Sequence, residues 1–483
     1  MDHFRATLLS LLALTAGAST LGALQRPPDR PNIVVYVADD LGWRDTGVYG
    51  NAAVRTPNID RIARSGLTVR YAFVTSPQCS PSRISILSGR YPHTTRTEDL
   101  HTPTPTGVRI LPSYLQSAGY FTGMMAKTHL GPNAERQFQW YSPETVAALP
   151  AFLDSAGTRP FFLWVAFHEP HRPYDTTAAP SHAPERSVVT PYLVDTRATR
   201  TDIARYYDAV AAMDRKIGEM TAELERRGLA GKTLVVFLSD NGAPFPREKG
   251  TLYDSGTREP LLFSWPGVVQ PAAVYDRAPV GLVDLMPTLR EVAGVAPDSL
   301  VQGRSFRSLL AAPESYTPQE YVFTERNWHD CDEHQRAVRD GRWKLIRTDA
   351  YTDLPLCTAA DIGTSPSFQA LRQRASSAPA RLTAAQRRLF EVPRARLELY
   401  DLERDPWEVH NLAGDPAQAA RVRQMAEVLQ EWMERTDDFP AAWRVRDDNT
   451  DRITGLPFSN RIPPLRDSIP PPPDVRWGTK GPG

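Results

Sequence analysis

Three uninterrupted apolar runs constrain the fold of this chain most strongly. They are Asn32–Ala38, Phe161–Phe167 and Thr233–Leu238. Runs without polar alternation are typical of strands buried on both faces of a parallel sheet. Segments with helical features lie between them, at Pro57–Gly66, Leu111–Ala118 and Thr201–Arg227. This alternation predicts an α/β fold, in which helices flank a parallel or mostly parallel sheet.

The character of the chain changes near Ser315. Short strands are predicted within Arg336–Ile346 and at Leu397–Leu402, and an amphipathic helix at Asp415–Thr436. Residues 357–395, polar and alanine-rich, are expected to form a helical insertion. We therefore predict a catalytic domain over residues 30–315 and a smaller α+β subdomain with an antiparallel sheet over residues 316–465. A proline-rich, extended tail follows at 466–483.

Residues 1–24 have the features of a signal peptide. Arg5 supplies positive charge, Leu8–Ala16 is apolar, and Ala16-Gly17-Ala18 provides a small-residue cleavage site. The apolar stretch is shorter than the roughly 20 residues that a membrane-spanning helix needs. We therefore expect cleavage and a secreted or periplasmic protein, rather than stable membrane insertion.

The 56 basic residues balance the 56 acidic ones, so the chain carries no net formal charge. This balance argues against nucleic acid as a partner, because no basic stripe dominates. An anionic substrate would have to be bound by a local group of cations.

The chain has three cysteines: Cys79, Cys331 and Cys357. In an exported protein the last two could pair, and their spacing leaves both outcomes open. Cys79 would then be unpaired. It begins the stretch Cys79-Ser80-Pro81-Ser82-Arg83, in which the proline is typical of a first helical turn. A helix N-terminus favours an anion, and Arg83 adds a charge one turn later, so we predict a nucleophile at an anion site.

Oxygen-bearing side chains follow two of the buried runs. Asp39 and Asp40 come after the first, and Asp240 and Asn241 after the third. Either pair alone is more typical of a helix cap or turn. Both pairs at strand ends of one sheet favour a hard divalent cation with oxygen ligands.

Cations and histidines follow other predicted strands. Lys127 and His129 come after Tyr120–Ala126, His168 and His171 after the second buried run, and Lys249 lies in a later loop. Each is commonly structural or solvated when taken alone. Together with a metal and a nucleophile, they predict electrostatic catalysis on a tetrahedral oxyanion, with a histidine to protonate the leaving group.

These motifs resemble those of the sulfatases of the alkaline-phosphatase superfamily, over about residues 31–412. Cys79–Arg83 is similar to the family's C-x-P-x-R signature, Lys127-Thr128-His129 to its Lys-x-His motif, and Ser239–Gly242 to a later block. The resemblance implies an alkaline-phosphatase-like sheet and oxidation of Cys79 to formylglycine, whose hydrate attacks sulfur. It also implies one Ca²⁺ bound by Asp39, Asp40, Cys79, Asp240 and Asn241.

The resemblance implies roles for the cations as well. Arg83 and Lys127 would hold the modified Cys79, with His129 assisting, and Lys249 and His171 would contact the sulfate. The leaving-group acid is expected to be His171, with His129 and Lys249 as alternatives. The partners implied are a sulfated saccharide and a formylglycine-generating maturation enzyme, and a homodimer is left open.

Within the family, the chain resembles the sulfamidases, which hydrolyse the N-sulfate of glucosamine. Three stretches carry this likeness: Phe161–Arg172, Pro191–Asp195 and Asp240–Pro246. Lys249 stands where we expect an arginine in that branch. Trp328-His329-Asp330 and Arg336 loosely match its substrate-facing stretch, and His329 and Arg336 are expected to bind substrate.

The resemblance predicts hydrolysis of a sulfated amino sugar, with the N-sulfate at a non-reducing end of heparan or heparin favoured. The alternatives are a carbohydrate O-sulfatase, a phosphonate or phosphate ester hydrolase with the same modified cysteine, and a non-catalytic binding protein. A two-zinc phosphatase is disfavoured, because histidine ligands for a second metal are not evident.

Overall fold

The computed structural model describes residues 30–441, 448–452, 456 and 458. The predicted signal peptide at 1–24 and the tail at 466–483 lie outside these residues. Among the described residues, no helix has the length and apolarity needed to cross a bilayer.

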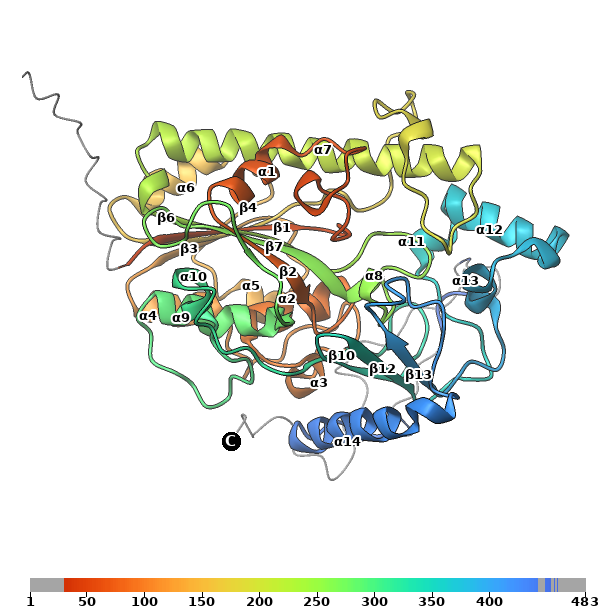
Figure 1. Ribbon diagram of the computed structural model, residues 1–483. Helices are drawn as coiled ribbons and strands as arrows, with labels where there is room; N and C mark the ends of the chain where they lie inside the picture. Colours follow the sequence, from red (N-terminus) through yellow and green to blue (C-terminus); the bar gives the residue numbers. More distant parts are fainter. Residues whose placement is uncertain (1–29, 442–447, 453–455, 457, 459–483) are drawn as a thin grey trace, which may run out of the picture.

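A mixed sheet forms the centre of the molecule (Figure 1). Within the described residues it has nine strands: β1 (Asn32–Ala38), β2 (Leu67–Phe73), β3 (Phe121–Ala126), β4 (Trp140–Ser142), β5 (Phe161–Ala166), β6 (Thr233–Ser239), β7 (Arg258–Ser264), β8 (Ala273–Tyr275) and β9 (Val280–Gly281). Their order is β4-β3-β5-β1-β6-β7-β2-β8, with β9 also paired to β2. Strand β7 runs antiparallel to both of its neighbours, and the other strand pairs of this sheet are parallel. The prediction of a mostly parallel sheet is therefore confirmed.

Helices cover both faces of this sheet, because alternate residues of its central strand point to opposite sides. Val34 and Tyr36 of β1 pack in one hydrophobic core, while Ile33 and Val35 pack in another. The first core is covered by α1 (Pro57–Arg64), α6 (Leu149–Ala156) and α7 (Arg197–Arg226). The second is covered by α2 (Cys79–Ser88), α4 (Leu111–Ser117), α9 (Leu285–Val292) and α10 (Arg307–Ala311). Figure 1 shows these two groups above and below the sheet.

Helix α7 begins one turn before the predicted start at Thr201. The hydroxyl of Thr196 accepts a hydrogen bond from the backbone N–H of Thr199, which caps the helix N-terminus. The first turn is polar, so hydrophobic spacing alone does not reveal it. Very short helices also lie in the loops: α3 (Pro92–Thr95), α5 (Pro132–Glu135) and α8 (Asp254–Thr257).

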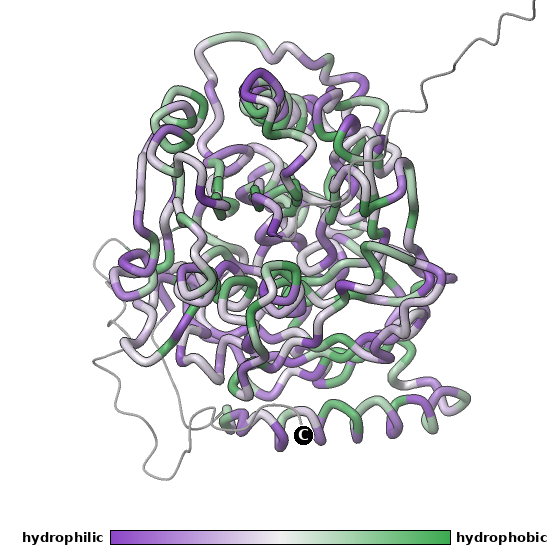
Figure 2. The backbone as a smooth tube through the Cα atoms, turned by 90° about the vertical axis from the view of Figure 1, so that its left-hand side faces the viewer, coloured by the Kyte–Doolittle hydropathy of each residue, from purple (hydrophilic) through white to green (hydrophobic). Residues whose placement is uncertain are grey.

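A second sheet follows in the chain. In the described residues it has four antiparallel strands: β10 (Val322–Arg326), β11 (Gln335–Arg339), β12 (Trp343–Thr348) and β13 (Leu397–Asp401). One face packs on α14 (Ala419–Arg435), through contacts such as Leu345 with the cluster around Leu429 and Trp432. Figure 2 shows hydrophobic and hydrophilic residues alternating along α14 at the bottom of the molecule.

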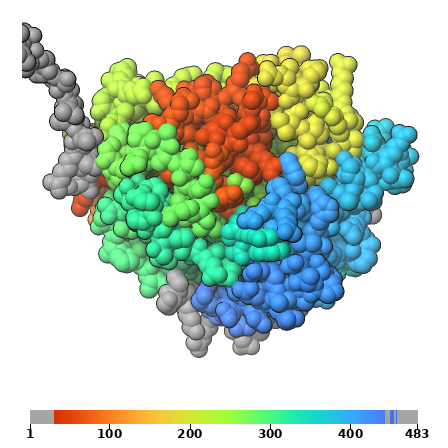
Figure 3. Space-filling view, in the orientation of Figure 1, coloured from red at the N-terminus to blue at the C-terminus, as the bar shows by residue number. Residues whose placement is uncertain are grey.

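The other face of the second sheet joins the core of the first part of the chain. Ala337, Ile346 and Tyr400 belong to the same hydrophobic cluster as residues of α7. The space-filling view shows the blue C-terminal residues in continuous contact with the rest of the molecule (Figure 3). The two sheets lie on either side of the predicted boundary at residue 315, which stays a prediction.

The expected insertion at 357–395 contains α11 (Ala360–Gly363), α12 (Pro366–Ser377) and α13 (Ala384–Arg387). The hydroxyl of Ser367 at the start of α12 donates to Asp202 of α7 over 2.7 Å. This contact anchors the segment to the first part of the molecule.

Candidate active site

Strand pairing brings the two predicted metal-binding pairs together. Strands β1 and β6 are parallel neighbours, with Ala38 opposite Ser239. Asp39-Asp40 and Asp240-Asn241 therefore leave the sheet side by side. The backbone N–H of Asp40 donates to Oδ1 of Asp240 over 3.2 Å, and Nδ2 of Asn241 donates to Oδ1 of Asp40 over 2.8 Å. Asp40 has a φ of 70°, a left-handed conformation that a short polar side chain tolerates.

Cys79 is the first residue of α2, as predicted, and its side chain is buried next to this acidic group. Its Sγ lies 3.6 Å from Oδ1 of Asp39 and 3.9 Å from Oδ1 of Asp40. Burial raises the pKa of the Cys79 thiol, although Lys127 and Lys249 act in the opposite direction. The thiol is therefore protonated at neutral pH, which makes the unmodified cysteine a poor nucleophile.

Arg83 lies one turn along α2 and is completely buried. Its Nε donates to Oδ2 of Asp240 over 2.7 Å, and its Nη2 lies 3.2 Å from Oδ1 of Asp39. The guanidinium thus contacts carboxylates that follow both strands. A buried charge needs such partners, because removing it from water costs several kcal/mol, by an order-of-magnitude estimate.

Two lysines approach the same group of acids. Nζ of Lys127 lies 2.5 Å from Oδ2 of Asp39 and 3.9 Å from Sγ of Cys79. Nζ of Lys249 lies 2.8 Å from Oδ2 of Asp40 and 3.0 Å from Oδ2 of Asp361. Burial alone would lower the pKa of Lys249, but Asp361 and Asp40 raise it well above its usual value, so it is charged.

The loop of Lys249 is fixed beside the loop of Cys79. The backbone N–H of Gly250 donates to the carbonyl of Pro77 over 2.8 Å. Gly250 adopts a φ of 78°, which favours glycine. Cys79 and Lys249 are 170 positions apart in the chain. This backbone bond between their loops helps to place both side chains in the same cavity.

The histidines differ in their surroundings. Burial, followed by the charges of Lys127 and Arg83, lowers the pKa of His129, so its ring is neutral. Burial also lowers the pKa of His168, and it lowers that of His101 to about 4. Nε2 of His171 lies 3.7 Å from Oδ2 of Asp40 and 3.7 Å from Oδ2 of Asp361, while its Nδ1 contacts the carbonyl of Arg172.

The residues at the strand ends suit a hard divalent cation. Ligand atoms of Asp39, Cys79 and Asp240 lie within 4.8 Å of one another, as do those of Asp40, Cys79 and His171. Oδ1 of Asn241 is buried without a hydrogen-bond partner among the described residues. An orphaned amide oxygen beside three carboxylates is the donor set that Ca²⁺ or Mg²⁺ prefers.

A cavity of about 690 Å³ opens above Cys79. Its lining includes these predicted residues: Cys79, Lys127, His129, His168, His171, Lys249 and His329. It also includes Asp330, which follows His329 in the stretch that the sequence singled out, and residues that sequence reasoning missed: His101, Glu135, Tyr141 and Asp361. The missed residues follow no buried strand and match no spacing pattern, so the sequence offers no local signal for them.

Arg336 does not reach this cavity. Its side chain is fully buried on β11 and donates to Asp438 through Nε and through Nη2, the latter over 2.8 Å. The expectation that Arg336 binds substrate is therefore not supported by its position. The expectation came from a loose sequence match, which carries no information on side-chain direction. The guanidinium of Arg336 instead binds Asp438, in the C-terminal part of the molecule.

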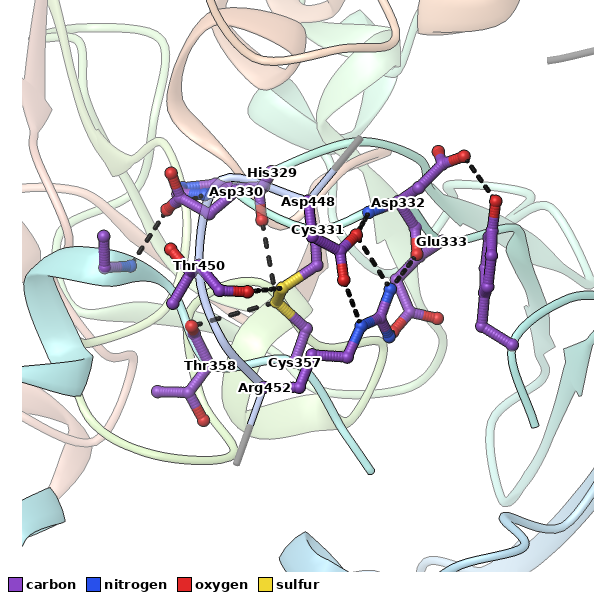
Figure 4. Close-up of a disulfide and its surroundings, with 12 residues drawn as sticks. His329, Asp330, Cys331, Asp332, Glu333, Cys357, Thr358, Asp448, Thr450 and Arg452 are labelled. Carbon is purple, nitrogen blue, oxygen red and sulfur yellow. Dashed lines mark hydrogen bonds and ion pairs between the residues drawn. A yellow bond between two sulfur atoms is a disulfide. The ribbon is translucent and has the colours of Figure 1, made fainter. Parts of the chain in front are cut away.

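A disulfide joins the remaining two cysteines, whose pairing the sequence left open. Cys331 and Cys357 are bonded, and Cys79 is free (Figure 4). The bond links the segment carrying His329 and Asp330 to the segment carrying Asp361. We call the cavity-lining residues of these segments, His329, Asp330, Ala360 and Asp361, the C-terminal wall.

Comparisons with known proteins show the family of this chain. The family model described as Sulfatase matches residues 31–148 and 138–295, more than half of the chain.

The chain belongs to the sulfatase family.

It is thus a hydrolase acting on sulfate esters or sulfamates. A second family model, N-sulphoglucosamine sulphohydrolase, C-terminal, matches residues 247–366 of this sulfatase. The sulfatase is 34% identical to human (Homo sapiens) N-sulphoglucosamine sulphohydrolase over 457 residues, which cover 84% of this chain and 90% of the human protein. It is 27% identical to an ulvan-active sulfatase of Formosa agariphila over 471 residues, covering 85% and 76% of the two chains.

Solved structures share the fold. A protein determined in complex with its substrate D-glucosamine-2-N,6-O-disulfate superimposes with a TM-score of 0.65 at 18% identity. The match covers 84% of this sulfatase and 98% of that protein. At this identity, the similarity establishes the architecture of the chain.

Proposed function

We propose that this sulfatase hydrolyses the N-sulfate of a glucosamine residue at the non-reducing end of a heparan- or heparin-type saccharide. The observation that carries the proposal is the position of Cys79, which lies between Asp39, Asp40 and Lys127 at the base of the cavity. The similarity to human N-sulphoglucosamine sulphohydrolase, which extends through the C-terminal wall, supports an N-sulfated amino sugar as the substrate.

Two groups are proposed to complete the site. Asp39, Asp40, Asp240, Asn241 and residue 79 would hold Ca²⁺, which would supply positive charge to neutralise sulfate oxygens. Formylglycine made from Cys79 would supply, as its hydrate, a hydroxyl nucleophile for sulfur. The high pKa of the Cys79 thiol supports a chemical role for the modified residue rather than for the thiol itself.

The chain's own residues then bind and orient the substrate. Arg83 fixes Asp39 and Asp240, and Lys127 holds residue 79 in place. Lys249 is proposed to bind a sulfate oxygen. Its high pKa supports this role, because the ammonium stays charged throughout the neutral range.

Proton transfer is assigned to His171, whose Nε2 points into the cavity between Asp40 and Asp361. We propose that Nε2 gives a proton to the leaving atom. His129 is a weaker candidate, because its lowered pKa keeps the ring neutral, and a neutral imidazole is a poor proton donor. His329, on the C-terminal wall, is proposed to contact the sugar.

We also propose that the enzyme is exported and matured by a formylglycine-generating enzyme. The predicted signal peptide supports export, and so does the Cys331–Cys357 disulfide, since disulfides persist in oxidising compartments. Mass analysis of the peptide from Tyr71 to Arg83 tests the maturation. An aldehyde in place of the thiol is expected in active enzyme, and an entirely unmodified thiol in fully active enzyme would contradict it.

The substrate is tested by sulfate release from two isomeric substrates, N-sulfoglucosamine and glucosamine 6-O-sulfate. Faster release from the N-sulfate is expected. Release from the 6-O-sulfate alone would support a carbohydrate O-sulfatase instead. A phenyl phosphonate ester included as a third substrate would reveal a phosphonate hydrolase.

A further inference from the structure

Asp361 is a cavity residue to which the proposed reaction assigns no role. It lies on the short helix α11, and its side chain is 23% exposed. Its Oδ1 accepts the backbone N–H of Ile362 over 3.0 Å. Its Oδ2 lies 3.0 Å from Nζ of Lys249 and 3.7 Å from Nε2 of His171. One oxygen is therefore fixed to the backbone, while the other faces the two residues proposed to handle the sulfate and the leaving group.

The position of Asp361 is well defined by its surroundings. The backbone N–H of the preceding residue, Ala360, donates to Oδ2 of Asp330 over 2.9 Å. Asp330 also contacts Nδ1 of His329 over 3.0 Å, so its carboxylate is occupied within the C-terminal wall. The disulfide from Cys357 to Cys331 closes the same loop (Figure 4).

The carboxylates near His171 have different tasks. Asp40 and Asp361 both lie 3.7 Å from its Nε2. Asp40 follows β1 and belongs to the proposed metal site. Asp361 comes from the C-terminal wall, where its Oδ2, paired with Lys249, also faces Nε2 of His171 and hence the substrate atom that receives its proton.

We propose that Asp361 binds the amino nitrogen of the hexosamine and so makes nitrogen a better leaving atom than oxygen at this site. The inference rests on the proposed function. When the S–N bond breaks, its electron pair stays on nitrogen, which takes one proton from His171 and leaves as a primary amine. Positive charge builds on this nitrogen as the proton of His171 arrives, and the N–H that the nitrogen already carries donates to the Asp361 carboxylate. The bridging oxygen of an O-sulfate has no hydrogen to donate, so the carboxylate favours nitrogen as the leaving atom.

The first test compares Asp361→Asn with the wild type on N-sulfoglucosamine and on glucosamine 6-O-sulfate. The substitution keeps the size of the side chain and removes its charge. We expect kcat/KM on the N-sulfate to fall about 10- to 100-fold more than on the O-sulfate, the range of a hydrogen bond to a charged group. An equal loss on both substrates would mean that Asp361 only positions Lys249, and would overturn the proposal.

Asp330→Asn is the matched control, because it removes a charge from the same wall, keeps the Asp361 carboxylate, and leaves an amide oxygen that can still accept the N–H of Ala360. It is expected to affect both substrates equally. A selective loss on the N-sulfate in this variant would contradict the assignment to Asp361. Thermal unfolding of each variant verifies that the fold is retained.

A binding test separates this inference from the proposed function and needs no formylglycine. Calorimetry on the Cys79→Ala protein should show tighter binding of glucosamine than of glucose. The preference should disappear when Asp361→Asn is added. If the wild type releases no sulfate from N-sulfoglucosamine, the proposed function fails, and this binding comparison alone decides the inference. Equal affinity of the Cys79→Ala protein for both sugars would overturn it.

Discussion

Nε of Arg83 donates to Oδ2 of Asp240 over 2.7 Å, and neither side chain is exposed to solvent. The bond connects the first turn after Cys79 to the carboxyl end of β6. It couples the integrity of the fold to the geometry of the site, because both partners lie next to the proposed nucleophile and metal.

Replacing Arg83 with methionine should destabilise the protein strongly. The change leaves Asp240 buried without its cation, a type of loss that costs about 3–5 kcal/mol. Thermal unfolding measures the effect. The matched control is Arg61→Met, which breaks the exposed pair with Glu225 and is expected to cost less than about 1 kcal/mol. Equal melting temperatures for Arg83→Met and the wild type would contradict the role of this pair.

Calcium should raise the melting temperature of the protein, and a chelator should reverse the effect. A ligand that binds only the folded state at about 100 times its Kd adds about 2.7 kcal/mol of stability. Asp240→Asn removes a proposed ligand charge and should abolish most of this increase. Asp361→Asn, which alters no proposed ligand, should retain it. A calcium response that is the same in Asp240→Asn and the wild type would exclude Asp240 as a ligand.

Glu248 should make the protein less stable as pH rises. Burial, with Asp45 acting in the same direction, raises the pKa of Glu248 to about 8, above its usual value of 4.5. The folded state therefore holds this proton more tightly than the unfolded state. The contribution of this proton to the free energy of unfolding is fully present below about pH 4.5. It is lost as pH rises through 8, by up to about 1.4 kcal/mol per pH unit.

The substitution Glu248→Gln tests this dependence. Glutamine can still accept the hydrogen bond that the hydroxyl of Tyr192 donates to Oε1 over 2.8 Å. The melting temperature of the variant relative to the wild type should increase steadily between pH 5 and pH 8. If the two proteins keep the same difference at both pH values, Glu248 does not titrate as described.

Loss of the Cys331–Cys357 disulfide should weaken substrate binding more than catalysis. The bond holds the two segments of the C-terminal wall, while Cys79 and the proposed metal ligands come from other loops. The double variant Cys331→Ser/Cys357→Ser is expected to have a KM raised about tenfold, since a rigid site reduces the entropy lost on binding. kcat should change less than KM. Steady-state kinetics on N-sulfoglucosamine decides the matter, and an unchanged KM would refute the role of the disulfide.

The sequence was most informative about polar side chains that directly follow buried strands. Asp39, Asp40, Asp240 and Asn241 could be predicted because strand pairing places the ends of β1 and β6 at one edge. Cys79 could be predicted from its helix start. Asp361 could not, since its position depends on how a helical insertion packs against α7. Arg336 was misplaced for a related reason: a loose match carries no information on side-chain direction within the second sheet.

The pairing of Ala38 with Ser239 has a further consequence for how such an enzyme can change over time. A slip of one residue would turn the core residues of β1 to the wrong face and separate the acidic pairs at the same time. Selection for stability and selection for catalysis therefore act on the same register. The register of the central sheet does not constrain the C-terminal wall, because the wall comes from loops outside that sheet. A new sugar preference can arise there while the inherited chemistry stays intact.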